Sequence, residues 1–132
     1  MTTSETVAAN KALVVKAITG VFVDRNPAVV DELFSPDYRQ HNPQIPNGTA
    51  AVKGLLAQLP ENFSYQPGLV MADGDYVAVH GRYVGWGPKP MVAIDIFRVA
   101  KGKVAEHWDV LQEEVPAAQA VNGNPMFPIG QP

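Results

Sequence analysis

Residues 91–111 read MVAIDIFRVAKGKVAEHWDVL, and this stretch predicts two β-strands joined by a turn at Ala100-Lys101-Gly102. Apolar, β-branched and aromatic residues dominate it, but Asp95, His107 and Asp109 interrupt the pattern. A carboxylate within such a run is costly to bury without a partner. We therefore expect these three side chains either to pair with one another or to carry out chemistry.

The length of the turn decides which of these side chains meet, because it fixes the pairing of the two strands. A two-residue loop, Lys101-Gly102, would place Asp95 opposite Trp108. A three-residue loop with Gly102 in a left-handed bulge would place Asp95 opposite His107 instead. We favour the second register, because it gathers the three ionisable groups on one face of the hairpin.

That register divides the hairpin into two faces, since side chains alternate along a strand. The first face carries Met91, Ala93, Asp95, Phe97, Ala105, His107, Asp109 and Leu111. The second face carries Val92, Ile94, Ile96, Arg98, Val104, Glu106, Trp108 and Val110. Both faces hold apolar residues, so we expect the sheet to be covered on both sides. An acid–imidazole–acid group on an apolar floor is the composition of a small-molecule pocket.

The length and composition narrow the possible functions. A chain of 132 residues suits one domain, 1–132, with one core. Its net charge is −3 and its ten Lys and Arg residues are scattered, which makes nucleic acid a poor candidate partner. It has no cysteine, no signal-peptide pattern and no apolar run of membrane-spanning length. We expect a soluble cytoplasmic protein.

The apolar periodicity predicts helices first and strands afterwards. A first helix should follow a capping box at Thr2 and Glu5, a second should begin at Asn26-Pro27 and end at Ser35-Pro36, and a third should run from Thr49 to Pro60. Strands should follow at 63–71, 76–85 and 91–111. The segment 113–132 is rich in Pro, Gly and Asn, and we expect an extended or partly disordered tail. This order indicates an α+β fold, in which a curved sheet wrapped by helices encloses a cavity.

Asp109 is the strongest catalytic candidate. It follows His107 and Trp108 on a strand that is expected to be central. Burial in an apolar pocket would raise the pKa of its carboxyl group towards the range useful for moving a proton between carbon and oxygen. The structural alternative is a carboxylate at the pocket rim that pairs with an arginine or caps backbone groups.

Asp95 and His107 are expected to form a pair in the favoured register. An imidazole and a carboxylate that face each other set one another's charge and tautomer. The alternative is a buried hydrogen bond with a purely structural role.

Two further histidines are candidates for the pocket. His41 follows Tyr38 in a segment expected to be a loop before the third helix, and its alternative is an exposed loop position. His80 shares a strand face with Ala78 and Arg82, whereas Val77, Val79 and Tyr83 take the other face. Sequence alone does not say which of these two faces looks into the cavity.

We expect neither a metal nor a cofactor. Two histidines and a carboxylate can hold non-haem iron, and His107 and Asp109 have a suggestive spacing. However, only His107 is grouped with acids. The lysines lie in turns, in a loop or on helix faces away from the apolar stripe, so a Schiff base is not expected. The chain also lacks a Gly-rich phosphate loop and a nucleophile elbow.

Four segments carry a family resemblance. YRQHNP at 38–43, IDIFRV at 94–99 and GKVAEHWDV at 102–110 resemble the SnoaL-like branch of the nuclear transport factor 2-like superfamily. NGNPMF at 122–127 resembles the end of a bacterial group of SnoaL-like aldol-condensation enzymes. The resemblance implies a cone-shaped, cystatin-like roll: a curved, mostly antiparallel sheet wrapped by three helices around a deep pocket, commonly dimeric through the outer sheet face.

The resemblance also implies roles for individual residues. In SnoaL-type polyketide cyclases an aspartate near the end of the last strand is the general acid/base for an intramolecular aldol ring closure, and Asp109 matches it. His107 also matches a histidine of those enzymes. Their pocket histidine on the preceding strand falls here on Asp95, so a substrate would meet a carboxylate at that position.

The sequence therefore predicts a cofactor-independent lyase or cyclase that acts on a small carbonyl compound by enolisation. Asp109, His107 and Asp95 are the expected catalytic residues, and the expected substrate-binding residues are Tyr38, His41, His80, Phe97 and Met91. The same pocket would suit an isomerase or a hydratase. The alternative is a non-catalytic protein that binds a small ligand.

The second face of the hairpin predicts self-association. Val92, Ile94, Ile96, Trp108 and Val110 form a broad apolar surface that helices on the opposite side cannot cover. Such a patch commonly marks an interface, so we expect a homodimer through the outer sheet face.

Overall fold

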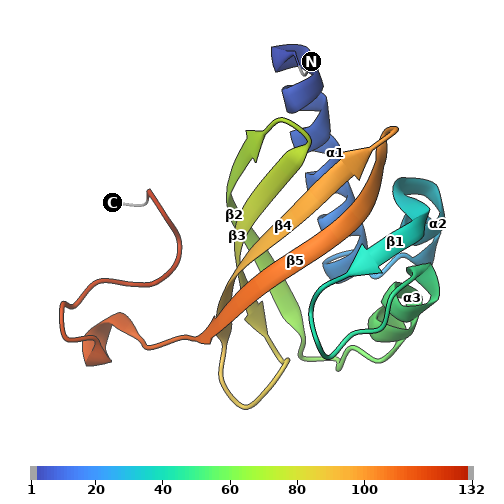
Figure 1. The fold of residues 1–132 in the computed structure, drawn as a ribbon. Coiled ribbons are helices and arrows are strands. Elements are labelled where there is room, and N and C mark those ends of the chain that lie inside the picture. Colours follow the sequence, from blue (N-terminus) through green and yellow to red (C-terminus); the bar gives the residue numbers. More distant parts are fainter. Residues whose placement is uncertain (1–2, 131–132) are drawn as a thin grey trace.

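The computed structural model describes residues 3–130, which form three α-helices and one five-stranded sheet (Figure 1). The elements follow in the order α1 (Ser4–Phe22), α2 (Pro27–Leu33), β1 (Phe34–Gln40), α3 (Thr49–Ala57), β2 (Ser64–Asp73), β3 (Tyr76–Val84), β4 (Met91–Ala100) and β5 (Lys103–Glu113). The sheet order is β1-β5-β4-β3-β2, with only the β1–β5 pair parallel. The predicted α+β class with a mostly antiparallel sheet is confirmed.

The helices begin at capping residues. The side chain of Thr3 caps α1 by accepting a hydrogen bond from the backbone N–H of Thr6. The expected capping box involves Thr2, which lies outside the described residues. Asn26 caps α2 and Pro27 occupies its first turn, as the sequence predicts.

Strand β1 corrects the sequence interpretation. Residues 34–40 were expected to end the second helix and begin a loop, but they form an edge strand that runs parallel to β5. Pro36 does not prevent this, because an edge strand leaves part of its backbone without a ladder partner. Strand β1 pairs with the second side of β5, and its end lies beside His107, since Gln40 is the partner of His107 in the register.

The register of the closing hairpin also differs from the prediction. The turn has two residues, Lys101 and Gly102, which both adopt positive φ angles, of 52° and 71°. A bulge then leaves Ala105 between the Val99–Val104 and Arg98–Glu106 pairs.

The bulge changes the partners but preserves the pocket face. Asp95 lies opposite Asp109, and Phe97 lies opposite His107. The shift amounts to two residues from the favoured register, so the alternation of faces survives. Two residues next to the bulge are exceptions. Ala105 lines a second surface cavity beside Arg98 rather than the pocket. Val104, which was expected on the second face, is fully buried in the core beside its partner Val99.

The three helices pack on one face of the sheet, which is the concave face (Figure 1). The core lies between them and combines α1 residues with inward residues of β3, β4 and β5, among them Val14, Ile18, Val21, Val77, Val79, Phe97 and Val104. The expectation that both faces are covered is wrong for the end of the outer face, where Val110 is 73% exposed. On β3, Val77, Val79 and Tyr83 point inward, so His80 points outward.

The tail after β5 turns back onto the outer face instead of running away from it. Glu114 makes a two-pronged ion pair with Arg82 of β3, and both contacts measure 2.9 Å. Further along, Phe127 stacks on His80 with ring centroids 5.5 Å apart. Between these anchors lies a short 3₁₀ helix, Ala117–Gln119. Within residues 3–130, no helix has the length and apolar character needed to cross a membrane.

Candidate active site

A cavity of about 630 Å³ lies between the concave face of the sheet and the helices. Its walls are largely apolar, with side chains from α1, β1, α3 and the three central strands. Asp95, His107 and Asp109 all face this cavity, as do the predicted residues Tyr38, Met91 and Phe97. The sequence therefore identified six side chains that the fold brings to one cavity.

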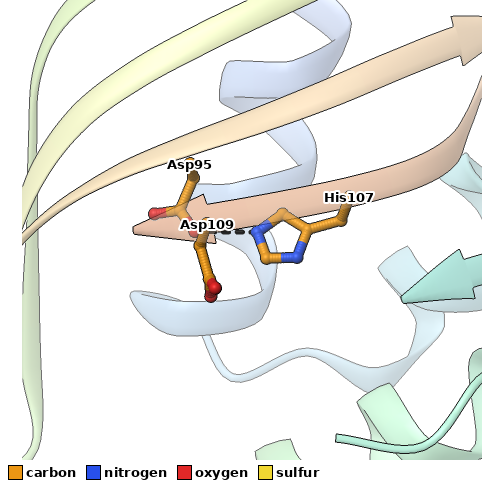
Figure 2. A group of neighbouring side chains, drawn as sticks. All are labelled: Asp95, His107 and Asp109. Carbon is orange, nitrogen blue, oxygen red and sulfur yellow. Dashed lines mark hydrogen bonds and ion pairs between the residues drawn. The ribbon is translucent and has the colours of Figure 1, made fainter. Parts of the chain in front are cut away.

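Asp95 and His107 form a buried pair, and their side chains point toward each other (Figure 2). The Nε2 atom of His107 lies 2.7 Å from Oδ1 of Asp95, and the hydroxyl of Tyr83 donates to Oδ2 at 2.7 Å. Burial, together with the nearby Asp95 carboxylate, holds the pKa of Tyr83 well above its ordinary value, so Tyr83 remains a hydrogen-bond donor. The contact expected between Asp95 and His107 is thus present, although the two residues are not directly opposite in the ladder.

Asp109 sits two residues beyond His107 and is half-buried at the cavity wall. The side-chain amide of Asn42 donates to both of its carboxylate oxygens, at 3.1 and 2.9 Å. The amide orientation is fixed, because Oδ1 of Asn42 accepts from the backbone N–H of Gln44 at 2.9 Å. Neither of the two arginines on β3 and β4 forms an ion pair with Asp109. Arg98 binds Glu106, and Arg82 binds Glu114.

Gln40 connects His107 to the opposite wall. Its Oε1 atom lies 2.6 Å from Nδ1 of His107, and its Nε2 atom donates to the hydroxyl of Tyr38 at 3.1 Å. Burial raises the pKa of Tyr38, and the Asp95 carboxylate raises it further, so this hydroxyl keeps its hydrogen. Within the described residues that hydrogen has no acceptor, which leaves Tyr38 as a spare donor at the cavity wall.

Three polar residues of the site were missed at the sequence level: Gln40, Asn42 and Tyr83. A signal for two of them was present in the segment 38–43. Once Tyr38 is taken as inward on a strand, strict alternation places Gln40 and then Asn42 on the same side. The sequence pattern predicts a loop for this segment, and a loop does not distinguish Gln40 and Asn42 from His41.

His41 and His80 do not belong to the pocket, which corrects two of the predicted substrate-binding residues. The ring of His41 stacks on Trp108 at a centroid distance of 4.7 Å and contacts Glu106 at 2.6 Å, on the outer face. His80 lies against Phe127 on the same outer face, and burial lowers its pKa. Both residues alternate with an inward neighbour on a strand or at its end, so the pleat turns them away.

The two carboxylates and the imidazole of the site are also groups that can bind a divalent cation. Asp95, His107 and Asp109 each offer one ligand atom, and these atoms lie within 4.8 Å of one another. One imidazole and two carboxylates suit several transition metals. The expectation that the protein uses no metal remains a prediction.

Comparison with solved structures shows what fold this is. The chain is similar to a proposed ketosteroid isomerase from Kribbella flavida DSM 17836, with a TM-score of 0.72 and 22% identity over 81% of this chain and 80% of that one. It is similar to a proposed polyketide cyclase from Bacillus cereus ATCC 10987, with a TM-score of 0.69 and 17% identity over 83% and 78% of the two chains.

The name of a third similar structure includes the name of its fold. A protein of unknown function with a cystatin-like fold, from Xanthomonas campestris, matches with a TM-score of 0.67 and 23% identity over 79% of this chain and 91% of that one. At such identities the likeness shows the fold. None of the curated proteins compared with this chain matches its sequence.

The sequence family is shown by a separate comparison. The family model described as SnoaL-like domain matches residues 14–107, which is well over half of the 132-residue chain. The matched range includes α1 from Val14 onwards, α2, α3, all of the first four strands, and β5 as far as His107. The protein therefore belongs to the SnoaL-like domain family, as its sequence motifs predict.

Proposed function

We propose that this protein is a cofactor-independent acid/base enzyme that enolises a small carbonyl compound and closes or joins it by an aldol step. The observation that carries the proposal is the placement of Asp109: its carboxylate lies on the wall of a largely apolar cavity, is held by Asn42, and has no cationic partner among the described residues. Names of the structural neighbours, which include an isomerase and a cyclase, agree with this class of chemistry.

The proposed reaction moves one proton in a cycle. Asp109 takes a proton from the carbon next to a carbonyl group, and the electron pair of the broken C–H bond forms the enolate. The enolate carbon then attacks a second carbonyl carbon, which forms the new C–C bond and leaves an alkoxide. Asp109 returns its proton to that alkoxide, so acid and base roles alternate on one carboxyl group.

Tyr38 is the proposed hydrogen-bond donor for the enolate oxygen. Its hydroxyl already accepts from Gln40, so its own hydrogen is free to point into the cavity. A donor in a water-poor site stabilises developing negative charge far more than it would in water. A 1,3-dicarbonyl substrate needs only a modest base, because its enolate is delocalised over two oxygens.

Deuterium exchange tests this proposal directly. A panel of 1,3-diketones in D₂O, followed by proton NMR, should show exchange at the central carbon that depends on the protein. Asp109→Asn should reduce the exchange rate by a factor of about 10² or more, which is typical of losing a general base. Thermal shift with the same diketones should be unchanged in Asp109→Asn.

The matched control is Glu106→Gln, which alters a carboxylate on the opposite face of the same strand. It should leave the exchange rate unchanged. Ligand-induced thermal shifts without exchange in the wild-type protein would instead favour the alternative, a non-catalytic protein that binds a small ligand.

We also propose that the protein is a homodimer through the outer face of the sheet. Ile94, Ile96 and Trp108 are only half-buried there, Val110 is largely exposed, and α1, α2 and α3 all lie on the opposite side of the sheet (Figure 1). Light scattering at micromolar concentration should give twice the chain mass. Val110→Lys should shift the protein towards the monomer, and a wild-type monomer would contradict the proposal.

A further inference from the structure

The side-chain amide of Gln40 has only one chemically sensible orientation. Its Oε1 atom accepts hydrogen bonds from the backbone N–H groups of His41 and Asn42, both at 3.1 Å. If the amide were flipped, its NH₂ group would face these two donors. The amide group is therefore oriented by the backbone at the end of β1, independently of His107.

The orientation of Gln40 determines where His107 carries a hydrogen. The atom that faces Nδ1 of His107 at 2.6 Å is an oxygen, which can only accept. Nδ1 must therefore be protonated. In a neutral imidazole only one nitrogen bears hydrogen, so Nε2 would then present a lone pair to its neighbour.

That neighbour is Oδ1 of Asp95, only 2.7 Å away, and the other oxygen of Asp95 accepts from Tyr83. Two lone pairs do not approach so closely in a buried site without a hydrogen between them. One further proton must lie in this contact, either on His107 as an imidazolium or on Asp95 as a carboxylic acid. In both cases the pair carries no net charge.

We propose that Gln40 is a positioning residue that fixes the tautomer of His107 and thereby keeps one proton in the buried contact between His107 and Asp95. This inference rests on the proposed function and refines it. It explains how two carboxylates in one cavity divide their roles: Asp95 belongs to a neutral pair, whereas Asp109 remains the anionic base.

Without an acceptor at position 40 the arrangement changes. His107 can then hold its single hydrogen on Nε2 and donate it to the Asp95 carboxylate. Nδ1 loses its hydrogen, and the pair carries one net negative charge beside Asp109. The difference lies in the protonation of a single ring nitrogen, which nitrogen NMR reports directly.

The experiment is a ¹⁵N spectrum of the histidine rings in full-length protein at neutral pH, dialysed against EDTA. The His107 signals are assigned from their loss in His107→Asn. In the wild-type protein Nδ1 should show the shift of a protonated nitrogen. In Gln40→Met, Nδ1 should move to the range of an unprotonated nitrogen.

Two variants separate positioning from simple packing. Gln40→Glu keeps an acceptor for His107 and for the two backbone N–H groups, so it should retain the protonated Nδ1 signal. Gln44→Met alters another cavity-lining glutamine, whose side chain makes no hydrogen bond within the described residues, and should change nothing.

Three results would overturn the inference. The first is an unprotonated Nδ1 in the wild type, a reading that stands even if Gln40→Met does not fold. The second is an unchanged Nδ1 signal in a folded Gln40→Met variant. The third is tight binding of added Zn²⁺ or Mn²⁺ that displaces the proton and is lost in Asp109→Asn, because the contact would then be a metal site. None of these readings needs a substrate, so a failure of the diketone exchange would refute the proposed function and leave this inference standing.

Discussion

Two histidine–carboxylate pairs lie on opposite faces of the sheet, and each has one member on β5: His107 in the first pair and Glu106 in the second. His107 and Asp95 meet at 2.7 Å inside, and His41 and Glu106 meet at 2.6 Å outside. The inner side chains are 8% and 4% exposed, whereas the outer ones are 35% and 13% exposed. The two contacts are nearly identical in length. They lie on opposite faces because consecutive residues of β5 point to opposite sides of the sheet.

The difference shows that burial, rather than contact distance, determines what such a pair requires. The inner pair needs Tyr83 and Gln40 to satisfy its remaining atoms, because water cannot do so. The outer pair shares Glu106 with Arg98, rests on Trp108 and meets solvent. An exposed pair contributes little to stability, whereas breaking a buried one leaves an uncompensated group in a low-dielectric site.

The largest expected effect comes from breaking each pair in turn. His107→Ala should lower the free energy of unfolding by about 3–5 kcal/mol, because Asp95 is left buried without its partner. His41→Ala should cost less than about 1 kcal/mol. Urea denaturation of the two variants measures both values. Equal losses in the two variants would contradict the comparison.

A smaller effect is expected from the packing that supports the inner face. A Cβ atom at Gly81 would lie 2.7 Å from the ring of Tyr65, which is itself packed against Tyr83 at a centroid distance of 4.6 Å. Gly81→Ala should therefore destabilise the protein by about 1–3 kcal/mol through overpacking. The matched control is Gly54→Ala on α3, where a Cβ would meet nothing within 4 Å.

Gly54→Ala should raise the stability of the protein, whereas Gly81→Ala should lower it. Alanine costs less backbone entropy than glycine within a helix, so Gly54→Ala should stabilise the protein by roughly 0.5–1 kcal/mol. Thermal unfolding of both variants gives the comparison. A tolerated Gly81→Ala would mean that Tyr65 has room to move, and that the inner face is packed less tightly than the distances indicate.

The smallest expected effect is the pH response of the outer pair. Hydrogen bonds from His41 and from Arg98 lower the pKa of Glu106 below its ordinary value of 4.5. Because the folded pKa is below the unfolded one, this stabilisation is present above the unfolded pKa and is lost as the pH falls through the folded pKa. The free energy of unfolding, measured by urea between about pH 7 and about pH 3, should fall less steeply in Glu106→Gln than in the wild type. Identical slopes would indicate that the pair has no role in acid stability.

Much of the fold could be predicted from apolar spacing and from turn residues. The helix starts at Asn26 and Thr49, and the strands around residues 64–73, 76–84 and 91–113, follow directly from local pattern. The strand at 34–40 could not be recognised in the same way, since Ser35 and Pro36 read as helix-ending residues. Its structure depends on pairing with β5, which is distant in the sequence and is not encoded locally.

The candidate site was only partly predictable for a related reason. Asp95, His107 and Asp109 stand out because ionisable groups are unusual in apolar strands. Gln40 and Asn42 are ordinary polar residues in a segment without apolar alternation, so their place in the cavity depends on β1 being a strand. The favoured hairpin register was wrong because positive φ at Lys101 allows a two-residue turn, and because a bulge leaves no clear signal in the sequence.

The bulge at Ala105 means that β5 contains one unpaired residue between the turn and the segment that carries His107 and Asp109. If a residue were lost on the turn side, closing the bulge would absorb the change, and His107 and Asp109 would keep their partners on β4. Beyond Glu106 the ladder is regular and holds no such reserve, so a lost residue there would turn Asp109 towards solvent. The part of β5 before Glu106 should therefore tolerate the loss of a residue, whereas the part that carries His107 and Asp109 should not.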